Sequence, residues 1–167
     1  MTFTTACPFF PEEEIPKILD KIKDVLQNKE MLTMGRHVEE FEKKFSNYIG
    51  TKYGIATNSC TSALETTLRS INVIGKEVIV PTQTFMATGA SVINAGGKVV
   101  FADINPKNYN ISLKSIKEKI TDKTKAIIVV HFAGLITDEI FEIKELCEDK
   151  DIYLIEDCAH AHGASID

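Results

Sequence analysis

The stretch EVIVPTQTFMATGASVINAGGKVVF, residues 77–101, decides the fold. Its first four residues predict a short strand, which Pro81 stops because proline has no N–H to donate to a sheet. Residues 85–94 predict a helix that a pair of glycines closes, and residues 99–101 predict the next strand. A strand, a helix and another strand in quick succession are typical of a parallel sheet covered by helices.

The same alternation continues on both sides of this stretch. Apolar runs predict further strands at residues 53–57, 125–130 and 152–155. Amphipathic segments predict helices at residues 61–71, 112–120 and 137–149. Strands rich in Ile and Val, separated by segments of helical length, favour an α/β fold: a mostly parallel sheet with helices on both faces.

The first third of the chain has a different pattern. Residues 12–28 and 36–48 predict two amphipathic helices, with Pro16 in the first turn of one and Gly50 just after the other. The sequence therefore predicts an N-terminal helical arm over residues 1–50 and an α/β domain over residues 51–167.

Composition narrows the class of protein. The 167 residues carry 24 acidic and 19 basic side chains, a net charge of −5, so no basic patch indicates nucleic-acid binding. The start of the chain lacks the pattern of a secretory signal, and the longest aliphatic run, residues 126–130, is far too short to span a membrane. The cysteines form no CxxC pair, which favours reduced thiols in a cytoplasmic protein; they are Cys7, Cys60, Cys147 and Cys158.

Ligands of parallel sheets bind beyond the carboxyl ends of the strands, so the residues after each strand are the candidates for a site. NSCTSALE, residues 58–65, leads into a helix whose free amides favour a phosphate group, although an ordinary N-cap uses the same residue types. Phe85 stands at a strand-to-helix junction, where its ring could lie against a flat ligand or pack in the core. His131 follows another strand and, as a lone histidine, favours a hydrogen-bonded structural role.

The last strand leads into YLIEDCAHAHG, residues 153–163, which groups Asp157, Cys158, His160 and His162. A metal site, a proton relay and a cofactor cradle use such residues. Zinc is disfavoured, because the Cys and His side chains would share one side only in an extended chain and the small residues here favour a turn. Together with the phosphate site and the aromatic ring, the carboxylate and imidazole favour a planar, phosphorylated, nitrogen-containing ring as the ligand.

Four segments in their order make the sequence recognisable. It resembles the DegT/DnrJ/EryC1/StrS family of pyridoxal-phosphate-dependent aminotransferases, which act on nucleotide-linked keto sugars. The segments are MLTMGRHVEEFEKKFSNYIGTKYGIATNSCTSAL (31–64), EVIVPTQTFMATGASVINAGGKVVFADINPKNYNI (77–111), TKAIIVVHFAG (124–134) and IEDCAHAHGA (155–164). The resemblance implies the N-terminal part of a fold-type-I large domain, pyridoxal 5'-phosphate at a homodimer interface, an amino-acid donor such as glutamate, and a place in polysaccharide biosynthesis.

The resemblance also implies roles for five residues. Cys60 and Thr61 would meet the phosphate through backbone amides and a hydroxyl, and Phe85 would stack on the pyridine ring. Asp157 would pair with the ring nitrogen and keep it protonated, so that the ring can accept electrons. His160 would approach the 3-hydroxyl. Cys60 replaces the Gly more usual in the family, and His160 stands where many relatives have Gln.

The resemblance assigns no catalytic residue within this chain, because the Schiff-base lysine belongs to a later segment, beyond Asp167. We therefore expect no transaminase turnover, and weak or no cofactor binding, from these 167 residues alone. Alternatives are a truncated, non-catalytic chain that associates with a partner, a sugar 3-dehydratase of the same family, and a metal hydrolase built on the 153–163 stretch.

Overall fold

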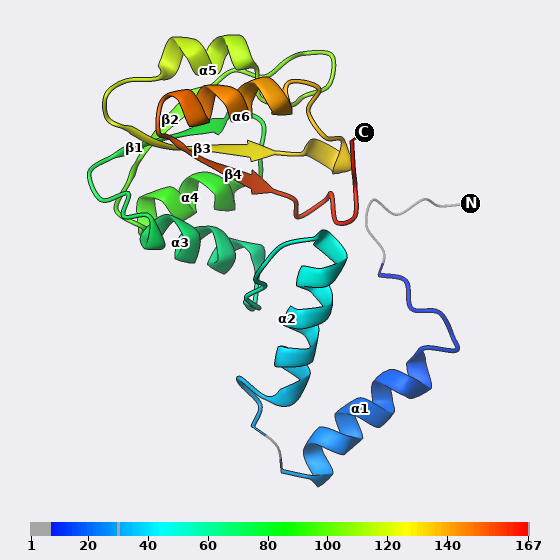
Figure 1. Cartoon of the computed structure of the whole chain (residues 1–167). Coiled ribbons are helices and arrows are strands. Elements are labelled where there is room, and N and C mark those ends of the chain that lie inside the picture. The colour runs from blue at the N-terminus through cyan, green and yellow to red at the C-terminus, as the bar shows by residue number, and fades with distance from the viewer. Residues whose placement is uncertain (1–7, 30, 167) are drawn as a thin grey trace. The chain divides into compact units, whose positions relative to one another are not determined.

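The computed structural model describes residues 8–29 and 31–166, and the chain forms two compact units, Met1–Ile55 and Ala56–Asp167 (Figure 1). Each unit is described by itself. The reduced thiol predicted for Cys7, and most of the stretch examined for a secretory signal, lie outside the described residues.

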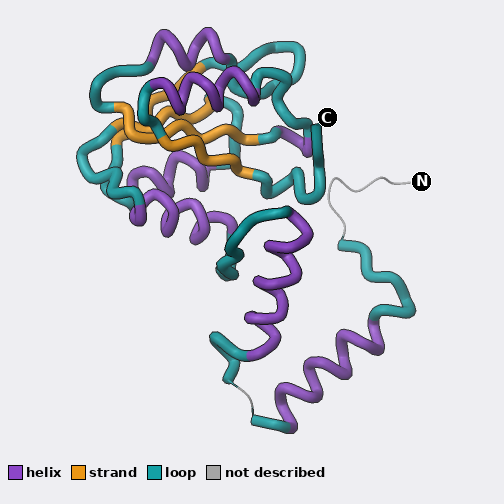
Figure 2. Tube along the Cα trace, in the orientation of Figure 1, coloured by secondary structure: helices purple, strands orange, loops and turns teal. Residues whose placement is uncertain are grey.

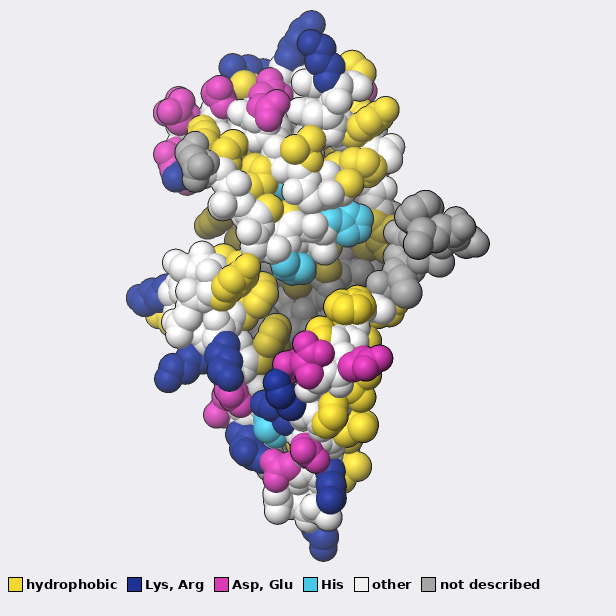
Figure 3. Space-filling view, turned by 90° about the vertical axis from the view of Figure 1, so that its right-hand side faces the viewer, with side chains coloured by type: hydrophobic (Ala, Val, Ile, Leu, Met, Phe, Trp, Pro, Cys, Tyr) yellow, Lys and Arg dark blue, Asp and Glu magenta, His cyan; other side chains and the backbone are white. Residues whose placement is uncertain are grey.

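The first unit contains two helices, α1 (Ile15–Gln27) and α2 (Arg36–Ile49). As predicted, Pro16 lies in the first turn of α1, and Gly50 ends α2 in a left-handed conformation with φ +82°. No residue of α1 is buried. Apolar side chains, yellow in Figure 3, are open to the surface in both units; those of α1 include Ile15, Ile18, Leu19, Ile22 and Leu26.

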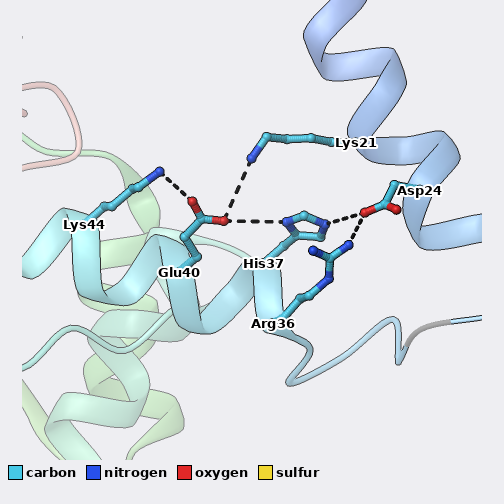
Figure 4. Close-up of polar contacts among 6 residues, drawn as sticks. All are labelled: Lys21, Asp24, Arg36, His37, Glu40 and Lys44. Carbon is cyan, nitrogen blue, oxygen red and sulfur yellow. Dashed lines mark hydrogen bonds and ion pairs between the residues drawn. The ribbon is translucent and has the colours of Figure 1, made fainter. Parts of the chain in front are cut away.

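Charged side chains connect α1 to α2 (Figure 4). Asp24 of α1 accepts a hydrogen bond from the guanidinium of Arg36 and lies 3.8 Å from Nε2 of His37. Glu40 of α2 lies 3.9 Å from the ammonium of Lys21. Exposed ion pairs contribute only about 0–1 kcal/mol each. Because α1 buries no side chain, the two helices share no buried apolar core. The charged pairs are polar contacts on the surface between them.

The second unit is built on a four-stranded parallel sheet in the order β2-β1-β3-β4 (Figures 1 and 2). Its strands are β1 (Glu77–Pro81), β2 (Lys98–Ala102), β3 (Thr124–Val130) and β4 (Tyr153–Asp157). The central strands β1 and β3 are almost wholly buried, whereas β2 and β4 are edge strands with exposed positions. Because the central strands of a parallel sheet are buried on both faces, their sequences are nearly continuous apolar runs. The predicted fold class is confirmed.

Helices cover both faces of the sheet (Figure 1). On one face lie α3 (Cys60–Ser70) and α4 (Met86–Asn94), and on the other α5 (Leu113–Lys119) and α6 (Ile140–Asp149). The pleat divides β3 between two cores: Ile127 packs on the α5 and α6 side, and Ile128 on the α3 and α4 side. Burying each such side chain fully stabilises the fold by about 1.5–3 kcal/mol.

Two sequence predictions are corrected. No strand forms over residues 53–57, because no described segment pairs with it and an unpaired strand leaves its backbone groups unsatisfied. Helix α6 begins at Ile140 instead of residue 137, because Thr137 forms a local turn in which its Oγ1 accepts from the amide of Glu139 at 3.4 Å. The remaining predicted elements agree within three residues, and none of the described helices is long and apolar enough to cross a lipid bilayer.

Candidate active site

Asp157 closes β4 at the carboxyl edge of the sheet, in register with Val130 of β3. The residue is only 8% exposed. Its Oδ1 accepts a hydrogen bond from the amide of Ala159 at 3.1 Å, which forms a tight local turn. The same oxygen lies 3.5 Å from Sγ of Cys60, the first residue of α3. The carboxylate is therefore fixed in direction and faces the N-terminus of a helix.

The N-terminus of α3 is capped by Ser59, whose Oγ accepts from the amide of Ser62 at 3.2 Å. The N-cap that the sequence allowed is thus present. It does not use the first two amides of the helix: within the described part of the chain, the N–H groups of Cys60 and Thr61 have no recorded acceptor. Unpaired amides and the helix dipole together favour an anion at this end of α3.

The Cys60 thiol is held in its neutral form. Partial desolvation of the sulfur, and then the neighbouring carboxylate of Asp157, raise the pKa of Cys60 to about 11. A protonated thiol can donate to the carboxylate of Asp157, which matches their 3.5 Å separation. Because the sulfur is uncharged at neutral pH, it does not repel an anion bound at the same helix end.

Phe85 and His160 are both on the surface. Phe85 is the N-cap residue of α4 and is 79% exposed, so the alternative of core packing is wrong. Helix α4 is tied to α3 by Ser91, whose hydroxyl donates to the carbonyl of Thr61 at 3.3 Å. His160 is exposed in a turn that the amide of Ala161 closes on the carbonyl of Cys158 at 2.8 Å. The structure therefore brings Cys60 and Asp157 into contact and leaves these two rings open to solvent.

A second group of side chains lies one residue along β4 from Asp157. His131, only 2% exposed, places Nε2 2.8 Å from Oε2 of Glu156. The nearby Cys158 sulfur and the Glu156 carboxylate, as hydrogen-bond acceptors, raise the pKa of His131 to about 9, and the hydrogen bond from His131 lowers the pKa of Glu156. The hydrogen bond expected of His131 is therefore present. Sequence reasoning missed the cluster, because it depends on β3 and β4 being neighbours in the sheet, which no local pattern encodes.

The zinc set considered from the sequence is not assembled. Among the described residues, Cys158 groups with His131 and Glu156 rather than with His160 and His162. The loop after Asp157 turns, as the small residues predicted, so the i, i+2, i+4 side chains do not converge on one side.

The loop after β3 supports the loop after β4. Asn110, 1% exposed, accepts from the amide of Phe132 at 3.0 Å and donates to the carbonyl of Leu135 at 3.1 Å. Gly134 has φ +89°, and a Cβ there would meet the carbonyl oxygen of His160 at 3.0 Å. A glycine is needed at this position for both reasons. The close approach holds the backbone of the His160 turn against the loop that carries His131.

Three comparisons identify what the chain is similar to. It is 39% identical over 132 residues to the dTDP-3-amino-3,6-dideoxy-alpha-D-galactopyranose transaminase of Aneurinibacillus thermoaerophilus, covering 78% of this chain and 36% of the relative. The structure matches the aminotransferase of Psychrobacter cryohalolentis with a TM-score of 0.86 and 36% identity, over 96% of this chain and 40% of that one. It also matches ntda of Bacillus subtilis, solved with bound cofactor PMP, with a TM-score of 0.86 and 33% identity, over 97% of this chain and 38% of that one.

The chain thus spans about two fifths of the length of these relatives. A family model described as the DegT/DnrJ/EryC1/StrS aminotransferase family matches residues 12–167, which is nearly the whole sequence. The match includes both helices of the first unit and the whole sheet, with Asp157 at the end of β4. The chain therefore belongs to the DegT/DnrJ/EryC1/StrS aminotransferase family.

Proposed function

We propose that the α/β unit binds pyridoxal 5'-phosphate and serves the transfer of an amino group, from a donor such as glutamate, to a nucleotide-linked keto-deoxy sugar. The proposal includes a full-length protein that acts as a homodimer in the cytoplasm. One observation carries it: the buried carboxylate of Asp157 lies 3.5 Å from Cys60 at the start of α3. The carboxylate of Asp157 can pair with a ring nitrogen, and the contact places it beside the N-terminus of α3, which suits a phosphate group.

The start of α3 supports the phosphate end of the proposal. The amides of Cys60 and Thr61 have no recorded acceptor among the described residues and stand at the positive end of an 11-residue helix. In the proposed site these two amides and the Thr61 hydroxyl hold the phosphate. The Cys60 side chain, although it replaces a more usual Gly, tolerates this role because its raised pKa keeps it neutral.

The buried carboxylate supports the ring end. When bound, the cofactor supplies an electron-withdrawing ring that stabilises negative charge on the reacting carbon. Asp157 would hold a proton on the ring nitrogen, and its burial makes that charge interaction stronger than it would be in water. The exposed ring of Phe85 is free to lie against a planar ligand, and His160 would donate to or accept from the 3-hydroxyl.

A chimera tests these roles without relying on these 167 residues for a whole active site. Residues 1–167 replace the matching part of a full-length relative, and amino-sugar formation from glutamate and the relative's keto sugar is measured. We expect an active chimera. We expect Asp157→Asn to reduce kcat by about 10²-fold or more, the range seen when one preorganised electrostatic partner is removed.

Asp122→Asn is the matched control, because Asp122 is exposed in the turn before β3, at the opposite edge of the sheet. Its chimera should keep full activity. Equal activity of the Asp157→Asn and unmutated chimeras, with equal affinity for the cofactor, would refute the proposed site. The unextended chain, assayed alongside, should show no turnover; measurable amine transfer by it would contradict the expectation that a later lysine is required.

A further inference from the structure

We propose that His131, Glu156 and Cys158 form a binding site for one divalent ion of the zinc class, on the face of the sheet opposite to Asp157. One ligand atom from each residue, an imidazole nitrogen, a carboxylate oxygen and a thiol sulfur, lies within 4.8 Å of the other two. This inference does not depend on the proposed function, because it uses none of the residues assigned to the cofactor.

The donor set favours zinc over harder ions. Imidazole, thiolate and carboxylate are the ligands of protein zinc sites, whereas magnesium and calcium select oxygen ligands. Bonds of about 2.0–2.3 Å in a tetrahedral site place ligand atoms about 3.3–3.8 Å apart. The present distances, 2.8 Å between His131 and Glu156 and at most 4.8 Å within the group, lie on both sides of that range. The Glu156 side chain is 46% exposed and can make the required adjustment.

The imidazole of His131 is held inside the cluster. The side chain is 2% exposed, its Nε2 lies 2.8 Å from Oε2 of Glu156, and the Cys158 sulfur is near enough to raise its pKa. The other two donor groups of the cluster therefore already face this ring. The ring is also fixed in place, because the loop that follows it is held by two hydrogen bonds to Asn110.

The cluster reaches solvent through Glu156, whose side chain is partly exposed. A water would complete a three-ligand zinc site. Glu156, but neither His131 nor Cys158, lines a pocket of about 320 Å³ together with Ile140 of α6 and Leu154 of β4. Lys144 also lines it and is the competing cation for Glu156. The ion must displace that lysine and the proton between His131 and Glu156, so the hydrogen-bonded pair of His131 and Glu156 is the state that it replaces.

The pleat of β4 separates this cluster from the proposed cofactor site. Leu154 packs with the α5 and α6 core and Ile155 with the α3 and α4 core. Successive residues of a strand point to opposite faces, so Glu156 lies on the same face as Leu154, and Asp157 lies on the same face as Ile155. Their contacts agree: Glu156 bonds to His131, and Asp157 meets Cys60 at the start of α3.

Cobalt is the probe, because Co²⁺ occupies zinc sites and absorbs light when bound to a thiolate. The purified 167-residue chain, stripped of metal with a chelator and checked for helix content by circular dichroism, is titrated with Co²⁺. We expect one ion per chain, a sulfur-to-cobalt charge-transfer band, and loss of the band on addition of one equivalent of Zn²⁺. Cys158→Ser should abolish the band, and Glu156→Gln should weaken binding by about tenfold or more.

Cys60→Ser is the control, since it removes an exposed thiol outside the cluster and should leave the titration unchanged. His131→Gln gives a second arm that retains both the thiol and the carboxylate. Absence of the charge-transfer band in the unmutated chain would overturn the proposal. So would a band that persists in Cys158→Ser, or equal affinities in all the variants, because each means that cobalt binds elsewhere.

Discussion

Cys60 offers a direct test of the contact on which the candidate active site depends. Its thiol is exposed to reagents, yet desolvation and the Asp157 carboxylate raise its pKa from an ordinary 9.0 to about 11. Thiolates, not thiols, react with iodoacetamide. Because the raised pKa keeps the sulfur protonated at pH 8, we expect Cys60 to be alkylated slowly although it is accessible.

The size of the effect follows from two opposing factors. A shift of two pKa units lowers the thiolate fraction about a hundredfold at a given pH below 9. A more basic thiolate is also more nucleophilic. With a Brønsted coefficient of about 0.4–0.5, the rate constant of the thiolate itself rises about six- to tenfold, which offsets part of the loss. We therefore expect alkylation of Cys60 to be about ten- to sixteenfold slower than that of an ordinary exposed thiol.

The assay separates the cysteines by their tryptic peptides. Cleavage after lysine and arginine places Cys60 in peptide 53–69, Cys147 in peptide 145–150 and Cys158 in peptide 151–167. Alkylation is quenched at intervals across a range of pH, and each peptide is quantified by mass spectrometry. Cys147 is 2% exposed and should stay unmodified, so its labelling reports unfolding.

Asp157→Asn is the decisive variant. The amide keeps an oxygen for the hydrogen bond from Ala159 but removes the negative charge beside Cys60. We expect faster alkylation of Cys60 and a pH–rate midpoint below that of the unmutated chain. The midpoint should stay above the ordinary value, because desolvation is the largest cause of the shift. Two results would refute the reasoning: an ordinary midpoint for Cys60 in the unmutated chain, or a midpoint that Asp157→Asn does not move.

Three further predictions concern stability, and each is measured by urea unfolding. Ile127→Ala, at a fully buried position of the central strand β3, should lower the free energy of unfolding by about 2–5 kcal/mol; a change under 1 kcal/mol would contradict the assigned core. Gly134→Ala should destabilise the chain by about 1 kcal/mol or more, because φ is +89° and the new Cβ meets the carbonyl of His160. Gly89→Ala, inside α4 with open space around its Cα, should stabilise it by about 0.5–1 kcal/mol, and a loss there would contradict the helix assignment.

The sequence predicts this sheet well because its local and tertiary signals agree. The central strands β1 and β3 carry Ile or Val at most of their buried positions, and each helix on the sheet contributes apolar side chains to the core. The segment 53–57 has the composition of a strand but no neighbour to pair with, and a pairing partner is a tertiary property that composition does not contain.

The candidate site divides in the same way. The position of Asp157 follows from the rule that ligands bind beyond the carboxyl ends of parallel strands. The start of α3 does not follow from this rule, because the strand expected before it, over residues 53–57, does not form. The cluster of His131 with Glu156 and Cys158 needs more: two residues 25 positions apart must lie near the ends of adjacent strands and on the same face of the sheet. Strand order supplies that information, and no local pattern encodes it.

The pleat of the edge strand β4 places two neighbouring carboxylates in different surroundings. Neighbouring residues of β4 carry two carboxylates, and alternation sends Asp157 toward α3 and Glu156 toward His131. The sheet therefore separates the carboxylate beside Cys60 from the carboxylate that is hydrogen-bonded to His131. Insertion of one residue between Ile155 and Glu156 would turn Glu156 toward the face of α3 and Asp157 toward the face of His131, so that the two carboxylates would trade faces. The spacing of Glu156 and Asp157 is for this reason a stronger constraint on the site than the identity of any residue in the loop that follows.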